Sequence, residues 1–139
     1  MEKHISPKPE FGERFFKYYQ DKGKIVMLNM LKFREKADYS KFPQLKPEGE
    51  ISGADAYKLY SMHTAPELQK VNGRVIYFGS SKHFLIGPDS EKWDAILIVE
   101  YDSITNFMAL TQSEDYLKTS GHRYAALEDS RLLPTSPLM

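Results

Sequence analysis

Few side chains in this sequence are of a type and in a position that could do chemistry. Asn29 stands inside the apolar run Ile25–Phe33, where an amide is costly unless it is hydrogen-bonded. Such an amide either holds an oxygen atom of a ligand or is tied to a neighbouring loop. Histidine titrates near neutral pH and could transfer a proton, so its positions matter too. The histidines, widely spaced, are His4, His63, His83 and His122.

Motifs of the common catalytic classes are missing. The 139 residues contain no cysteine, which excludes disulfides, thiolate catalysis and cysteine-ligated metal sites. The sequence also contains no G-x-S-x-G nucleophile motif, no glycine-rich phosphate loop and no H-E-x-x-H pair. We therefore expect neither a metal nor a cofactor. Any chemistry would depend on the side chains of a pocket.

Composition and charge exclude several classes of partner. Nineteen basic and nineteen acidic residues give a net charge of zero, which argues against a nucleic-acid partner and against a polybasic membrane anchor. No run approaches the roughly 20 apolar residues of a membrane helix. Met1–Glu10 lacks the apolar segment of a secretory signal, so we expect a cytoplasmic protein. The aromatic content of 13% hints at a lined pocket or an interface.

The pattern of apolar residues predicts which elements must position these side chains. Helices are predicted over Phe11–Gln20, Gly53–Val71 and from Ile104 to about Glu128. Strands are predicted over Ile25–Phe33, Arg74–Ile86, Trp93–Tyr101 and Asp129–Leu133. Two irregularities are expected, a kink or break at Pro66 and a bulge at Gly79.

The order of these elements, a helix followed by βαββαβ, is typical of the α+β ferredoxin-like fold. It predicts an antiparallel four-stranded sheet with both long helices on one face. Residues 1–139 would form a single domain, with an N-terminal extension and short helix (1–22), a core (23–133) and a tail (134–139). The loop Arg34–Ser52, about 19 residues long, is expected to be a mobile cover of the pocket or of a dimer edge.

The predicted strands are apolar on both faces, although helices cover only one. A bare apolar face needs a partner, and a short N-terminal helix is too small to cover four strands. We therefore expect a homodimer that packs sheet to sheet. Alternation along the strands puts Asn29 and Tyr101 on one face and Ile98 on the other. The sequence alone does not say which of these faces meets the helices.

Several segments together resemble the uncharacterised domain-of-unknown-function family 1330, over roughly residues 22–133. They are VMLNMLKF (Val26–Phe33), Gly73-Arg74-Val75, LIGP (Leu85–Pro88), WDAILIVEY (Trp93–Tyr101), the DS-x₃-F segment (Asp102–Phe107), the segment around Tyr116 and HRYAALEDSRLL (His122–Leu133). The family belongs to the dimeric α+β barrel superfamily, in which two ferredoxin-like protomers pack their sheets together. The resemblance therefore implies the same fold and dimer.

The resemblance also implies a site. Monooxygenases of this superfamily, both cofactor-free and haem-degrading, carry an asparagine on the first strand and an aromatic residue at the end of the third. The haem enzymes add a histidine in the last helix. The matching positions are Asn29, Tyr101 and His122, which would be the catalytic residues at the border of one cavity. Asn29 would hold a carbonyl or enolate oxygen, and His122 or Tyr101 would transfer a proton. Tyr101 stands where the haem enzymes carry tryptophan.

Further side chains are candidates for contact with a small-molecule ligand: Tyr57, Tyr60, His63, Trp93 and Arg123. Packing is the alternative for the aromatic residues, and exposure to solvent is the alternative for His63. The sequence thus predicts a homodimeric small-molecule-binding protein, with cofactor-independent monooxygenase- or isomerase-like chemistry. Two alternatives stay open: a haem-binding or haem-degrading protein with His122 as axial ligand, and a non-catalytic metabolite-binding module.

Overall fold

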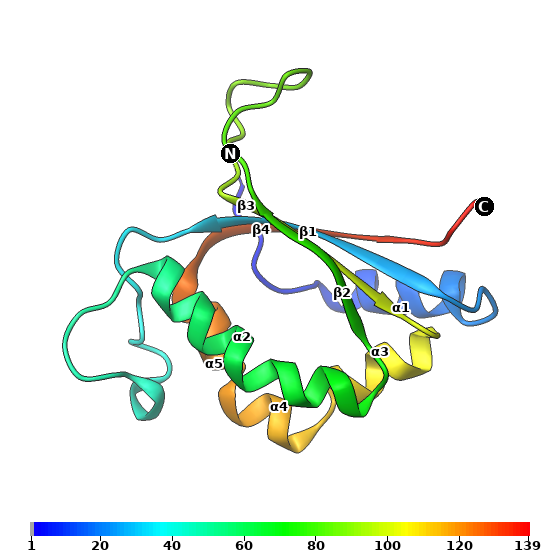
Figure 1. Cartoon of the computed structure of the whole chain (residues 1–139), viewed down its shortest axis with the longest axis horizontal. Coiled ribbons are helices and arrows are strands. Elements are labelled where there is room, and N and C mark those ends of the chain that lie inside the picture. The colour runs from blue at the N-terminus through cyan, green and yellow to red at the C-terminus, as the bar shows by residue number, and fades with distance from the viewer. Residues whose placement is uncertain (1) are drawn as a thin grey trace.

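Four antiparallel strands form one sheet in the order β2-β3-β1-β4 (Figure 1). The computed structural model describes residues 2–139. The strands are β1 (Ile25–Phe33), β2 (Arg74–Ser80), β3 (Ala95–Tyr101) and β4 (Leu127–Thr135). With the helices between them, they give the predicted ferredoxin-like βαββαβ arrangement, preceded by an N-terminal helix.

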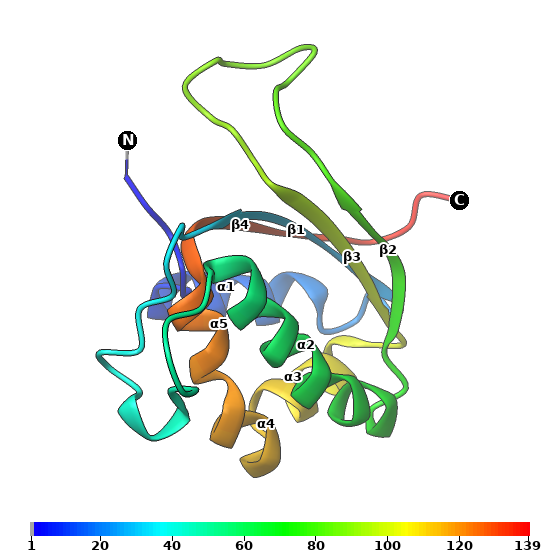
Figure 2. The same cartoon turned by 60° about the vertical axis from the view of Figure 1, so that its left-hand side comes forward.

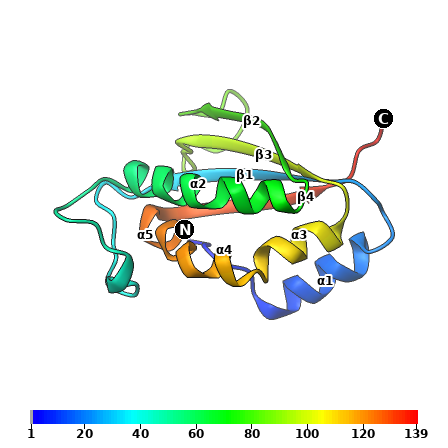
Figure 3. The same cartoon turned by 60° about the horizontal axis from the view of Figure 1, so that its bottom comes forward.

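All the helices lie on the same side of this sheet (Figure 3). They are α1 (Pro9–Tyr19), α2 (Gly53–Lys70), α3 (Ile104–Thr111), α4 (Glu114–Thr119) and α5 (Gly121–Ala126), with a short 3₁₀ turn, η1 (Pro43–Leu45). The helical stretch predicted from Ile104 to about Glu128 is thus divided into three short helices. Ser113 starts α4 by accepting a hydrogen bond from the Tyr116 N–H, which ends the preceding helix.

The structure differs from the sequence expectation at two points, one in α2 and one in β2. Pro66 lies within α2 without splitting it, so the predicted break was wrong. Pro66 lies on the exposed side of the helix, where water can satisfy the carbonyl that lacks its N–H partner. The register of β2 shifts between Val75 and Tyr77 instead of at Gly79.

Strand ends also differ from the expectation. β2 stops at Ser80, and residues 81–94 form a connection to β3 that projects away from the sheet (Figure 2). β4 continues through Pro134 to Thr135. The missing N–H of Pro134 is tolerated because β4 is an edge strand that pairs only with β1.

The strand face that meets the helices is the face of Asn29. Its neighbours in alternation on β1, Met27 and Leu31, are buried, as are Val99 and Tyr101 on β3. These residues contribute to two core clusters, one beneath α2 and α5 and the other beneath α3. The strand residues in both clusters are therefore the alternate residues of β1 and β3 that share a face with Asn29.

The other face of the sheet is apolar and carries no helix within residues 2–139. It presents Val26, Leu28, Met30, Tyr77, Ile96 and Ile98. The N-terminal helix does not cover it, because α1 lies on the same side as α3, where Phe15 packs edge-on against Phe107 at 5.5 Å. We refer to these six residues as the open face.

The loop Arg34–Ser52 does not cover the open face either. Its backbone is tied to α5, with Arg34 N–H donating to the Ala126 carbonyl at 2.8 Å and Asp38 N–H to the Ala125 carbonyl at 2.9 Å. Tyr39, within this loop, is buried in the core cluster beneath α2 and α5. The structure therefore places this loop against the last helix and not over a pocket.

Candidate functional site

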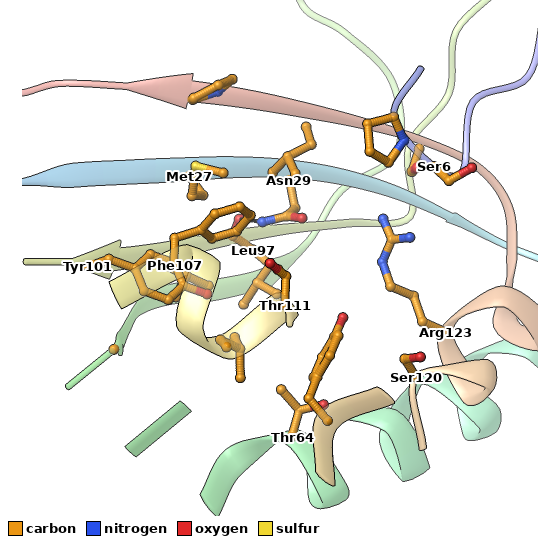
Figure 4. A pocket seen from close by; sticks show the side chains of 18 of the residues that line it. Ser6, Met27, Asn29, Thr64, Leu97, Tyr101, Phe107, Thr111, Ser120 and Arg123 are labelled. Carbon is orange, nitrogen blue, oxygen red and sulfur yellow. Dashed lines mark hydrogen bonds between the residues drawn. The ribbon is translucent and has the colours of Figure 1, made fainter. Parts of the chain in front are cut away.

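A cavity of about 1410 Å³ lies between the sheet and the helices (Figure 4). It exceeds the roughly 300–1,000 Å³ of ordinary ligand pockets. Its wall is rich in aromatic rings from six elements: Phe11, Phe15, Tyr19, Tyr57, Tyr60, Phe78, Tyr101, Phe107 and Tyr116. Large apolar walls with a few polar groups are typical of sites for small organic molecules.

Asn29 projects from β1 into this cavity. Its Nδ2 donates a hydrogen bond to the Leu97 carbonyl on the paired strand β3 at 3.2 Å. Nδ2 carries two N–H donors, and this bond uses one of them. The second N–H and the side-chain oxygen are therefore available to a ligand. The sequence left open whether the Asn29 amide is bonded within the fold or holds a ligand. In this geometry the same amide can do both.

Tyrosine hydroxyls supply further polar groups on the cavity wall. Tyr57, Tyr60 and Tyr101 all line the cavity, and the Tyr60 and Tyr116 hydroxyls lie 2.8 Å apart. Burial raises the pKa values of Tyr57, Tyr101 and Tyr116 far above the usual value, and the neighbouring Tyr60 adds to each shift. These groups therefore stay protonated at neutral pH, where they can donate hydrogen bonds but cannot act as bases.

His122 does not line the cavity, contrary to the expectation from the resemblance. Its Nδ1 lies 2.6 Å from the Tyr39 hydroxyl, and its ring stacks in parallel on His63 at 5.4 Å. Successive helical residues point about 100° apart, so His122 and Arg123 cannot both face the cavity, and it is Arg123 that does. The residues present therefore do not fit a haem ligated by His122 in this cavity.

Two other candidate ligand contacts are also absent from the cavity wall. His63 is exposed on α2 and contacts His122. Trp93 is buried just before β3, where the Arg131 guanidinium lies 5.0 Å from the centre of its ring. Trp93 is a packing residue in the structure, which is the alternative that its position at a strand start had suggested.

The N-terminal segment is a part of the cavity wall that the sequence did not reveal. His4 to Lys8 and α1 close one side of the cavity. The Ser130 hydroxyl donates to the His4 carbonyl at 2.6 Å, and Arg123 Nη1 donates to the Ile5 carbonyl at 2.7 Å. The sequence signal for this contact was the apolar side of α1, which includes Phe15 and Tyr19. That signal does not show which part of the protein the helix packs against.

The buried pair of His122 and Tyr39 should make stability depend on pH. Burial first, and the nearby His63 second, lower the pKa of His122 below its usual 6.5. Protonation is then harder in the folded state, so the unfolding free energy should fall as pH drops below 6.5. The slope is at most about 1.4 kcal/mol per pH unit for one proton.

Urea unfolding between about pH 7.5 and pH 5.5 measures this dependence. His122→Gln should flatten the dependence in that range, because the carboxylates titrate at lower pH. An equal slope in the wild type and in His122→Gln would contradict the prediction.

No group of three or more metal-ligating side chains occurs within residues 2–139. In the same part of the chain, no helix is long and apolar enough to cross a membrane. The site that the structure offers is therefore the aromatic cavity with Asn29, the tyrosine hydroxyls and Arg123 on its wall.

Comparison with known proteins places the chain among uncharacterised proteins. Residues 48–133 match the family described as "Domain of unknown function (DUF1330)". A protein of unknown function from Rhodopseudomonas palustris, RPA0582, is 34% identical, with a TM-score of 0.87 over 99% of both chains. No curated protein matches the sequence.

More distant structures share the fold alone. A dimeric ferredoxin-like protein of unknown function from Bacteroides fragilis is 11% identical, with a TM-score of 0.51 over 86% of this chain and 100% of that one. A candidate antibiotic biosynthesis monooxygenase from Caulobacter crescentus is 9% identical, with a TM-score of 0.55 over 91% of this chain and 99% of that one.

Proposed function

The chain belongs to the DUF1330 family of unknown function, and on that premise we propose that it is a homodimer that binds a small organic molecule in the cavity between sheet and helices. The observation that carries the proposal is the cavity of about 1410 Å³ with its aromatic wall. A compact core would fill such a space with side chains, since protein interiors are packed as densely as organic crystals. A space of this size lined by aromatic rings favours an apolar ligand.

The open face supports the homodimer. It presents six apolar side chains, Val26, Leu28, Met30, Tyr77, Ile96 and Ile98, with Ile98 between Leu28 and Tyr77. Tyr77 is 54% exposed in the single chain. Contiguous apolar patches of this kind mark interaction surfaces. The structure from Bacteroides fragilis with the same fold is described as dimeric.

A cofactor-independent enzyme is the second candidate, favoured by the donors around Asn29. The free N–H of Asn29 and the protonated hydroxyl of Tyr101 are of the type that holds a developing oxyanion. A simple binding module ranks first, because burial keeps the hydroxyls of Tyr57, Tyr101 and Tyr116 protonated and His122 lies outside the cavity. Turnover of a bound compound would decide between the two candidates.

Filling the cavity tests the proposal. Thr64 projects into the cavity from α2, and its buried hydroxyl has no hydrogen-bond partner within residues 2–139. Thr64→Trp should weaken binding of an uncharged aromatic probe, 1-pyrenebutanol, by about tenfold or more, because the indole occupies the space of the pyrene. Met62→Trp is the matched control, since Met62 is 68% exposed on the same helix and lies outside the cavity.

Pyrene fluorescence measures both affinities, and circular dichroism checks that each variant is folded. Equal affinities in the wild type and in Thr64→Trp would contradict binding in the cavity. A loss of affinity in Met62→Trp would do the same.

A further inference from the structure

We propose that the ligand is an amphipathic organic acid, with an aromatic or other apolar body and a carboxylate bound by Arg123. This inference rests on the proposed function, because it names the class of molecule that the same cavity would take. It depends on three features of the wall: the sign of its charge, the state of Arg123, and the separation of polar from apolar groups.

The charged residues that line the cavity within residues 2–139 are all of one sign. Lys8, Arg14, Arg123 and Arg131 line it, whereas no aspartate or glutamate does within residues 2–139. The whole chain has equal numbers of basic and acidic residues, so the bias is local to the cavity. A cavity lined by one sign of charge attracts ligands of the opposite sign.

Among these four cations, Arg123 is the one that is partly buried and has no carboxylate partner within residues 2–139. It is half-buried, its Nη1 donates to the Ile5 carbonyl at 2.7 Å, and no carboxylate pairs with it within residues 2–139. A guanidinium has five N–H donors, so most of them remain for a ligand. A partly buried charge without a counter-ion is costly, and an anionic ligand would supply the counter-ion.

The other three cations differ from Arg123 in their surroundings. Arg131 is already paired, with Nη1 2.7 Å from an Asp129 carboxylate oxygen. Lys8 and Arg14 are exposed, and both lie over the ring of Phe11, Arg14 at 4.5 Å from its centre. These two can steer an anion toward the cavity, but Arg123 is the group placed to bind it directly.

Polar and apolar groups occupy different ends of the cavity (Figure 4). Arg123 projects inward near the hydroxyl-bearing Ser6 and Ser120, whereas Met27, Tyr101 and Phe107 gather at the other end. Asn29, with its free N–H, lies between these two groups. This arrangement matches a molecule with a carboxylate at one end and an apolar body at the other, since carboxylates accept hydrogen bonds from guanidinium and hydroxyl groups.

The test compares two probes that differ only in the polar head group, the carboxylate of 1-pyrenebutyric acid and the hydroxyl of 1-pyrenebutanol. The wild type should bind the acid roughly tenfold or more tightly at neutral pH, because a charge-assisted hydrogen bond is added. Arg123→Met keeps an unbranched side chain of similar apolar stem without the charge and should abolish this preference. Arg123→Lys should keep part of the preference for the acid, because the lysine ammonium is a cation but lacks the planar set of N–H donors of a guanidinium.

A further variant separates the charge of Arg123 from its contact with the N-terminal segment. Ser130→Ala removes another hydrogen bond to that segment, at the His4 carbonyl, and leaves Arg123 in place. This change should weaken binding of the acid and of the alcohol to the same extent, so the ratio of the two affinities should stay unchanged. A ratio that falls in Ser130→Ala as much as in Arg123→Met would overturn the role of Arg123.

The two proposals fail in different ways. Equal affinity of the wild type for acid and alcohol, with binding still lost in Thr64→Trp, would overturn the organic acid and leave the cavity as a site for neutral molecules. An alcohol affinity unaffected by Thr64→Trp would overturn the proposed function itself, and the organic acid with it.

Discussion

Replacing Ile98 by aspartate should convert the proposed homodimer into a folded monomer. Ile98 lies at the centre of the open face, paired with Leu28 on one side and Tyr77 on the other. A carboxylate there would be buried between two sheets without a partner, at a cost of roughly 3–5 kcal/mol. Such a cost weakens association a hundredfold or more. In the monomer the same carboxylate faces water, so the fold should survive.

Sedimentation velocity gives the mass, and circular dichroism reports the fold. The wild type should sediment at twice 16.1 kDa and Ile98→Asp at 16.1 kDa. Met62→Asp, a similar change at an exposed position of α2, should stay dimeric. A wild-type monomer, or an Ile98→Asp variant that remains a dimer, would show that the open face is not the interface.

Replacing Gly53 by alanine should be the most destabilising single-methyl change in the chain. Gly53 starts α2 where the helix meets the loop, and its N–H donates to the Arg34 carbonyl at 2.9 Å. An added Cβ would clash with that same carbonyl oxygen and lie 2.6 Å from the Ala126 carbonyl oxygen. Both are backbone atoms that cannot move aside, so we expect a loss of about 3 kcal/mol or more.

The matched control is Gly12→Ala on α1, where an added Cβ meets nothing within 4 Å. Alanine is the better helix former, so this change should leave the unfolding free energy unchanged or raise it by up to about 1 kcal/mol. Urea unfolding of both variants measures the contrast. A Gly53→Ala variant as stable as the wild type would show that α2 is not held against the loop in this way.

The strands and their order along the chain could be predicted, because the spacing of apolar residues reflects which side chains are buried. The run at Ile25–Phe33 has the same bounds in the sequence pattern and in β1, since a mainly apolar run between polar turns fixes both ends. Strand parity also placed Asn29 and Tyr101 on one face. The sequence did not show which face of the strands meets the helices, because both faces are apolar. The structure shows it.

The part of the site on the last helices could not be predicted in this way. His122 and Arg123 are neighbours, and a rotation of about 100° decides which faces the cavity. That rotation follows from contacts distant in sequence, namely Tyr39 from the loop and Ile5 from the N-terminal segment. The wall built by α1 was missed for a similar reason, because amphipathicity shows that a helix has a buried side but not what it packs against.

The most direct test of the cavity is methyl NMR of the methionines during titration with 1-pyrenebutanol. Met27 and Met108 line the cavity, whereas Met30 lies on the open face and Met62 on the outside of α2. We predict large ring-current shifts at Met27 and Met108 with saturation, and none at Met30 or Met62. Shifts at Met30 without shifts at Met27 would place the ligand on the open face and contradict the account.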